Sequence, residues 1–304
     1  MKIDKNLKNK KVELLQYYRS RAEEFLSEIK LTYGNTQYRE QASAINKSLI
    51  ETKDILLATL LQIAENEKWT NREKLESILM ITYTNYIVML ESRNDVWPYE
   101  YMTFSRRIGE LWEPFCKLCF AYPINKIQLF IPPLFSEVKK KLSDEIEAYI
   151  DKLKISKEEK KQLKKYYYKV WGLVTSGEIK LELDLHFIYN NQKIVVDFKS
   201  GFGSNEKGNT NRLLLVASIY KNLEENYKCM IFVRANENNH YFQTLKNSGI
   251  WDAFSGAEAY NQMNIFSGFD IKNWIELNVN WEKDFKKETM QFFKQNNLDQ
   301  YLIW

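Results

Sequence analysis

Cysteine, glycine and proline are all scarce in this chain of 304 residues. The three cysteines are an odd number and too few for a disulfide framework, which predicts a reducing, cytoplasmic environment. Ten glycines and five prolines interrupt the chain rarely, as is typical of a helix-rich protein. The polar first residues predict no signal peptide, and the absence of any apolar run of about 18 residues predicts no membrane partner.

Several motifs of other enzyme classes are missing as well. Cys116 and Cys119 form a C-x-x-C, but the chain has no second pair, and His186 and His240 are distant in sequence. We therefore expect the two cysteines to pack in the core and to bind no zinc. Without a Walker phosphate loop, a nucleophile elbow or a cofactor fingerprint, the sequence predicts no nucleotide cofactor and makes a small-molecule enzyme the least favoured class.

What the chain does contain is apolar residues, at 44% of the composition, which suffices for one large domain or two closely joined ones. The net charge is only +4, and no polybasic tail is present. An enzyme that acts on nucleic acid would therefore have to concentrate its positive charge locally, in a cleft.

The stretch 177–201 predicts two strands joined by a tight turn. Polar and apolar residues alternate over 179–189 and 193–200, which is the pattern of strands with one buried face. Asn190 and Asn191 lie between them, and asparagine tolerates the left-handed conformation that a two-residue hairpin turn requires. One polar face carries Glu182, Asp184 and His186 on the first strand, and Asp197 and Lys199 on the second.

A two-residue turn also fixes the pairing of the strands: Asp184 faces Asp197, and Glu182 faces Lys199. Two facing carboxylates repel each other unless a divalent cation lies between them, because hard cations prefer carboxylate oxygens. With Lys199 beside the cation, the arrangement predicts a site that polarises a phosphate and activates water. The alternative is an exposed hairpin with ordinary surface charges.

The order Leu183-Asp184, a gap of twelve residues, then Asp197-Phe198-Lys199 resembles the PD-(D/E)xK nuclease motif, with leucine in place of the proline. The local sequences ELDLHF and VVDFKSG are similar to those of type II restriction endonucleases. This resemblance implies an α/β (α+β) fold with a restriction-endonuclease-like mixed β-sheet core flanked by helices. It also implies catalytic Asp184, Asp197 and Lys199, and Mg²⁺ held by both aspartates and the Phe198 carbonyl.

A predicted helix over 101–120 contains the pattern R-x-G-x-x-W-E, which resembles the helix that precedes the catalytic hairpin in many restriction endonucleases. The resemblance makes Glu113 a further catalytic and metal-binding residue, while Glu110 and Glu182 remain alternatives. Pro114 predicts a bend in this helix or an end to its first part. Two candidate phosphate contacts also lie on it, Arg106 and Arg107.

The rest of the chain predicts a helical N-terminal region over 1–95 and a nuclease core over 96–304, with a helical insertion around 134–173. After the hairpin come a glycine-containing loop over 201–210, a helix over 211–223 and a buried strand over 227–235. The predicted order is thus strand, strand, helix, strand.

Basic and amide side chains outside the hairpin are candidate DNA contacts, with a solvated surface as the alternative for each. The segment from Glu137 to Lys169 contains 11 basic and 7 acidic residues, and its lysines lie beside tyrosines, which suits a phosphate backbone. Asparagine at a strand end suits a base edge. The candidates are Lys164, Lys165, Lys207, Arg212, Arg234 and Asn236.

Together these features predict a Mg²⁺-dependent, sequence-specific endonuclease that hydrolyses phosphodiester bonds of double-stranded DNA, and the resemblance implies a homodimer on a palindromic site. One alternative is a nuclease of the same fold for repair or recombination, without a fixed site. Exonuclease-type members show a glutamine and a tyrosine on the helix after the lysine, and here only Tyr220 is present. The other alternative is a non-catalytic DNA-binding protein.

Overall fold

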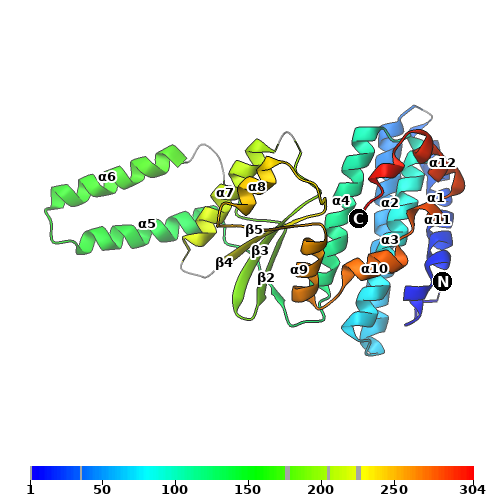
Figure 1. The fold of residues 1–304 in the computed structure, drawn as a ribbon, viewed down its shortest axis with the longest axis horizontal. Helices are drawn as coiled ribbons and strands as arrows, with labels where there is room; N and C mark the ends of the chain where they lie inside the picture. Colours follow the sequence, from blue (N-terminus) through cyan, green and yellow to red (C-terminus); the bar gives the residue numbers. More distant parts are fainter. Residues whose placement is uncertain (1, 35, 175–178, 204–205, 224–226) are drawn as a thin grey trace.

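The computed structural model describes residues 2–34, 36–174, 179–203, 206–223 and 227–304. Along its longest axis a helical bundle, a central sheet and a projecting pair of helices follow one another (Figure 1). The protein is therefore mixed helix and strand, with a mixed sheet at its centre, as the sequence predicts. None of the helices in the described ranges combines the length and the apolar character needed to cross a bilayer.

The N-terminal bundle consists of α1 (Lys11–Tyr33), α2 (Tyr38–Asn66) and α3 (Asn71–Val96), preceded by a short 3-10 turn (Leu7–Asn9). In α3 every residue from 77 to 94 is buried. A helix buried on all sides forms the centre of a bundle, so α3 is the axis around which the other helices pack.

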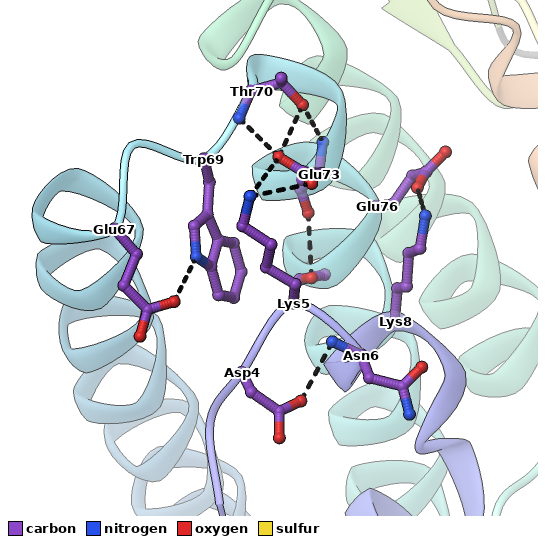
Figure 2. A network of polar contacts seen from close by, with 10 residues as sticks. Asp4, Lys5, Asn6, Lys8, Glu67, Trp69, Thr70, Glu73 and Glu76 are labelled. Carbon is purple, nitrogen blue, oxygen red and sulfur yellow. Dashed lines mark hydrogen bonds and ion pairs between the residues drawn. The ribbon is translucent and has the colours of Figure 1, made fainter.

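Figure 2 shows how the start of α3 is held. The Thr70 amide donates to Glu73 Oε2 at 2.7 Å, and the Glu73 amide donates to Thr70 Oγ1 at 3.2 Å, which is a reciprocal capping box. Lys5, just before the 3-10 turn, pairs with Glu73 at 3.2 Å, and Lys8 within the turn pairs with Glu76 at 2.6 Å. This N-terminal segment is thereby attached to the first two turns of α3.

Helix α4 (Tyr101–Ala121) lies between the bundle and the sheet (Figure 1). It continues through Pro114 to Ala121, so the predicted end at this proline is wrong. Trp112 before the proline and Phe115 after it are both fully buried. This packing offsets the loss of the backbone hydrogen bond that the proline cannot make. Cys116 and Cys119 are free and buried in the same helix, which confirms their predicted packing role.

The sheet has the order β1-β2-β3-β4-β5. The predicted hairpin is present: Tyr189 pairs with Gln192, and Asn190 and Asn191 have φ angles of 49° and 61°, as the left-handed turn requires. β3 continues in parallel with β4, and β4 with β5. The strand bounds are β1 (Gln128–Leu129), β2 (Leu185–Tyr189), β3 (Gln192–Lys199), β4 (Tyr227–Val233) and β5 (Asp252–Ser255).

Two of the predicted boundaries around the hairpin are wrong. The first strand begins at Leu185, so residues 179–184 precede the sheet, while 177 and 178 lie outside the described residues. Helix α7 (Lys207–Lys221) begins four residues before the expected 211, which shortens the predicted loop. The predicted order of strand, strand, helix and strand is nevertheless confirmed by β2, β3, α7 and β4.

Each face of the sheet has its own core. Ile194, Val196 and Phe198 of β3 join α4 and the N-terminal bundle in one continuous apolar cluster. Val195, on the opposite face, belongs to a second cluster with α7 and α8 (His240–Lys246). The N-terminal helices therefore share a core with one face of the sheet.

The projecting pair consists of α5 (Phe135–Lys152) and α6 (Lys157–Val174) (Figure 1). The Ser156–Glu159 capping box predicted for the second helix is present, because each residue's amide donates to the other's side chain. Lys164 reaches back to α5 and pairs with Asp151 at 3.0 Å and Glu147 at 3.4 Å. Lys164 therefore joins α6 to α5.

The C-terminal segment returns to the bundle through α9 (Ala257–Ser267), α10 (Ile271–Asn278), α11 (Trp281–Asp284), α12 (Lys287–Gln295) and a 3-10 turn (Asp299–Tyr301). The chain is extended at Phe285, which separates α11 from α12. The amide of Lys286 donates to the buried Glu91 of α3 at 2.6 Å, so a tertiary hydrogen bond replaces the helical one.

Glu91 also receives two hydrogen bonds from Arg19 of α1, at 2.9 and 2.6 Å, and thus joins three segments. We expect Glu91→Gln to lower the free energy of unfolding by about 3 kcal/mol, because it removes the buried charge that the half-buried Arg19 pairs with and leaves that guanidinium without its counter-charge. Urea unfolding measures this. Glu51→Gln, which removes an exposed carboxylate 3.9 Å from Lys47, is the matched control and should change stability by less than about 0.5 kcal/mol. Equal losses in both variants would contradict this role.

Candidate active site

The two predicted aspartates lie at the same end of the hairpin. Asp197 is the third residue from the end of β3 and its side chain is only 2% exposed, while Asp184 directly precedes β2. The Asp184 Oδ2 atom accepts a hydrogen bond of 2.7 Å from the Phe198 amide. This carboxylate therefore continues the pairing to β3 beyond the end of β2 and lies next to Asp197. A buried aspartate does not fit the alternative of ordinary surface charges.

Lys199 occupies the position between two of the predicted metal ligands. Its Nζ atom lies 2.5 Å from Asp197 Oδ2 and 3.1 Å from the Phe198 carbonyl oxygen. The contact with Asp197 is an ion pair without hydrogen-bond geometry, so this buried oxygen has no hydrogen-bond partner. The carboxylate and carbonyl oxygens thus already converge on one positive charge.

Arg212, in the second turn of α7, reaches the other oxygen of the same carboxylate. Its Nη2 atom lies 3.5 Å from Asp197 Oδ1. Arg212 is a predicted DNA contact, and the structure gives it an additional role that the sequence reasoning missed. Two cations therefore flank Asp197, one from its own strand and one from the following helix.

The pKa of Asp197 is raised to about 6, mainly by burial and in addition by the neighbouring Asp184 carboxylate. Lys199 is the main opposing influence and lowers this pKa, with a smaller contribution from Arg212. The ionised form of Asp197 is therefore disfavoured in this site. A bound cation would stabilise that form and lower the pKa again.

His186 is a second residue that the sequence reasoning did not assign to the site. Its Nε2 atom accepts a hydrogen bond of 3.1 Å from the Leu183 amide, next to Asp184. Burial lowers the pKa of His186 to about 4, so the imidazole is neutral at neutral pH and keeps its acceptor nitrogen. The available signal was the alternation that places His186 on the same face as Asp184.

The three glutamates considered for the metal site lie elsewhere. Glu113 pairs with Lys117 at 3.3 Å, and Glu110 pairs with Arg106 at 2.7 Å. Glu182 is exposed and forms no ion pair with Lys199 among the described residues, because the first strand starts only at Leu185, so their expected pairing is wrong. No three His, Cys, Asp or Glu side chains in the described part of the chain form a group that could hold a metal, and the role of Glu113 stays a prediction.

Helix α4 touches the end of β3 through the glycine of its R-x-G-x-x-W-E pattern. A Cβ atom on Gly109 would lie 2.8 Å from the Cβ atom of Ser200, the residue after Lys199. The ring of Trp112 lies 5.7 Å from the ring of Phe198, on the opposite face of β3 from Asp197. Gly109 and Trp112 therefore seat α4 against the strand that carries the site.

The predicted DNA contacts fall into two groups. Exposed side chains that face solvent are Arg106, Lys165 and Lys207, and Arg107 is half-buried. The others are engaged within the protein. Lys164 joins α5 to α6, Arg234 donates to the Ile303 carbonyl at 2.6 Å, and Asn236 packs so closely on Gly256 that a Cβ atom there would overlap its Oδ1 atom.

Comparison of the chain with protein-family models, curated proteins and solved structures finds no match of any of the three kinds. The chemistry of the site is therefore argued from its own residues. Two carboxylates and a backbone carbonyl are the hard oxygen ligands that Mg²⁺ takes, with water completing its coordination. The buried Asp197 Oδ2 atom accepts no hydrogen bond and its contact there is the positive charge of Lys199, so the donor atoms present fit a cation of this kind.

The contact between Gly109 and Ser200 predicts a specific pattern of stability. We expect Gly109→Ala to lower the free energy of unfolding by about 1–3 kcal/mol, because the new methyl group would force α4 away from β3. Adding Ser200→Gly should restore most of the loss, since it removes the opposing Cβ atom. Urea unfolding of both single variants and the double variant measures this coupling. Additive losses in the double variant would contradict a direct contact.

The raised pKa of Asp197 predicts how stability depends on pH. Between about pH 4 and pH 6 the folded protein binds a proton that the unfolded chain has lost, so this group's contribution to stability falls as pH rises through that window. We expect Asp197→Asn to gain on the order of 3 kcal/mol relative to the wild type between about pH 4 and about pH 7.5.

Unfolding in urea with EDTA at both pH values measures this difference. His186 acts in the opposite direction, because its lowered pKa removes stability as pH falls from 6.5 through about 4. This effect is common to wild type and Asp197→Asn and cancels in the comparison. A pH-independent difference would show that Asp197 titrates as an ordinary carboxyl.

Proposed function

We propose that this protein is a Mg²⁺-dependent endonuclease that hydrolyses phosphodiester bonds of double-stranded DNA at a specific sequence. The observation that carries the proposal is the buried Asp197, with Asp184 beside it on the neighbouring segment and Lys199 at its Oδ2 atom. This combination of two acids and a lysine at one end of a hairpin is typical of phosphoryl-transfer chemistry and costs stability in a protein that does not use it.

Asp184, Asp197 and the Phe198 carbonyl would hold the ion. An ion held there would polarise the scissile phosphate as a Lewis acid and would lower the pKa of water, which makes that water a better nucleophile. The Asp184 carboxylate is fixed by the Phe198 amide, and His186 fixes the backbone beside it, so these oxygens are preorganised before any substrate binds.

Lys199 and Arg212 supply the positive charge for the substrate. Their cationic groups lie at the two oxygens of one buried carboxylate, so both are positioned for the phosphate that this carboxylate would help to bind. In this position Lys199 stabilises the negative charge that develops on the phosphate oxygens in the transition state. Arg212 orients the same phosphate through its planar guanidinium.

The exonuclease-type alternative loses support from Tyr220. Its hydroxyl donates to the Leu181 carbonyl at 2.8 Å, and its ring is fully buried, so this tyrosine anchors the segment before Asp184 and does not face the substrate. A homodimer that binds a palindromic site remains part of the proposal, on the resemblance to restriction enzymes.

Cleavage of plasmid DNA with Mg²⁺ or with EDTA tests the proposal. We expect discrete fragments with Mg²⁺ only, and a loss of rate of at least about 100-fold in Asp184→Asn, Asp197→Asn and Lys199→Ala, because each removes a charge that acts on the reacting phosphate. DNA binding should be largely kept by Lys199→Ala. Glu113→Gln decides whether this residue also contributes, with Lys117→Gln as the control for breaking their ion pair.

The outcomes separate the candidates. A smear instead of discrete fragments would favour a nuclease without a fixed site. Intact DNA bound by the protein would favour a non-catalytic DNA-binding role. Thermal unfolding with Mg²⁺ provides a readout independent of activity, because a ligand that binds only the folded state stabilises it. Stabilisation of the wild type and none of Asp197→Asn is the expected result.

A further inference from the structure

Three arginines converge on a hollow that the proposed chemistry does not use. The hollow has a volume of about 440 Å³ and lies between α2, α3 and α4. Arg93 of α3 and Arg106 and Arg107 of α4 line it, together with a single carboxylate, Glu110. We call it the arginine hollow.

Arg93 is the unusual member of this set. It is only 7% exposed, and no carboxylate lies within ion-pair distance of it in the described part of the chain. Its guanidinium lies 4.0 Å from the centre of the Tyr99 ring and 4.8 Å from that of Trp97, and it donates to the Trp97 carbonyl. A buried cation with no counter-charge is costly, and a bound anion would offset that cost.

The neighbouring charges do not supply the missing anion. Glu110 Oε1 lies 2.7 Å from Arg106 Nε, and Glu110 Oε2 lies 3.6 Å from Arg107 Nη1, so one carboxylate serves two arginines and leaves Arg93 unmatched. Burial lowers the pKa of Arg93 and the charge of Arg107 lowers it further, and the opposing effects of Tyr99 and of the more distant Glu100 carboxylate do not offset them. On the wall of the hollow, the buried Asn46 Oδ1 atom has no hydrogen-bond partner and would accept a hydrogen bond from a ligand.

We infer that the arginine hollow binds a phosphate group of the DNA strand, at a position other than the one that is hydrolysed. This inference rests on the proposed function. Guanidinium groups match phosphate oxygens with paired hydrogen bonds, and Arg93 is held ready by its aromatic neighbours.

The location favours DNA over a free phosphate compound. Arg106 lies one helical turn, about 5 Å, before Gly109, and Gly109 touches Ser200 beside Lys199. The hollow therefore begins about one turn of α4 away from the end of β3 that carries Lys199, a separation that one bound DNA duplex can span.

DNA binding in EDTA tests the inference without requiring cleavage. The labelled duplex contains the sequence that the wild-type protein cleaves, or is a random plasmid fragment if no such sequence is found. It is titrated with the wild-type protein, Arg93→Met and Arg107→Met at several salt concentrations. We expect about ten-fold weaker binding by each variant and a salt dependence reduced by about one phosphate contact. Arg72→Met is the matched control, because Arg72 also stacks on an aromatic ring, that of Phe269, but lies outside the hollow. It should bind DNA as the wild type does.

Two further measurements keep the inference testable whether or not cleavage occurs. Inorganic phosphate and a deoxynucleoside monophosphate, compared with chloride at equal ionic strength, should raise the melting temperature of the wild type and of Arg72→Met but not of Arg93→Met. Arg93→Lys keeps the charge without the paired donors, and should recover only part of the affinity. Stabilisation by phosphate together with unchanged DNA binding in Arg93→Met would overturn DNA as the source. No effect in either assay would overturn the site itself.

Discussion

The burial of the Asp197 carboxylate is the constraint on which the candidate site depends. Because the side chain is almost fully buried, its pKa is raised and its negative charge needs cations nearby. β3 supplies Lys199 at one carboxylate oxygen, and α7 supplies Arg212 at the other. The neighbouring Asp184 carboxylate also raises the pKa of Asp197, because a second negative charge disfavours the ionised form and increases the need for positive charge. Without the two cations the buried carboxylate would lack counter-charges, and in contact with water it would not need them.

Helix α4 connects the candidate site to the rest of the molecule. One side packs against α3 and the other against β3, so the N-terminal bundle and one sheet face share a single core. The close approach of Gly109 to Ser200 fixes where the helix crosses the end of β3. Arginines on the preceding turn are thereby placed near the proposed path of the DNA without belonging to the sheet. The N-terminal bundle has no chemical motif of its own, but its contact with α4 helps to position these arginines.

Charge is distributed unevenly over the chain. The segment from 137 to 169 has 11 basic and 7 acidic residues, an excess of 4, which equals the net charge of the whole chain. The remaining residues are therefore balanced, with 33 basic and 33 acidic side chains, since 44 less 11 and 40 less 7 both give 33. Positive charge near the proposed site must come from placement rather than from excess, as with Arg212 at Asp197 and Arg93 in the arginine hollow. The projecting α5–α6 pair carries the excess itself, although Lys164 is used between its two helices.

The sequence by itself determined the hairpin, its turn and its register, because alternation and the two asparagines are local signals with a period of two. It therefore also determined that Asp184 and Asp197 would be neighbours, and it gave the order of β2, β3, α7 and β4. Only the tertiary structure decided that Glu182 misses Lys199, that Arg212 reaches Asp197, and that the C-terminal helix breaks at Phe285 against Glu91. Each of these depends on contacts between segments far apart in the chain, where burial and long-range hydrogen bonds outweigh local periodicity, and no local pattern records them.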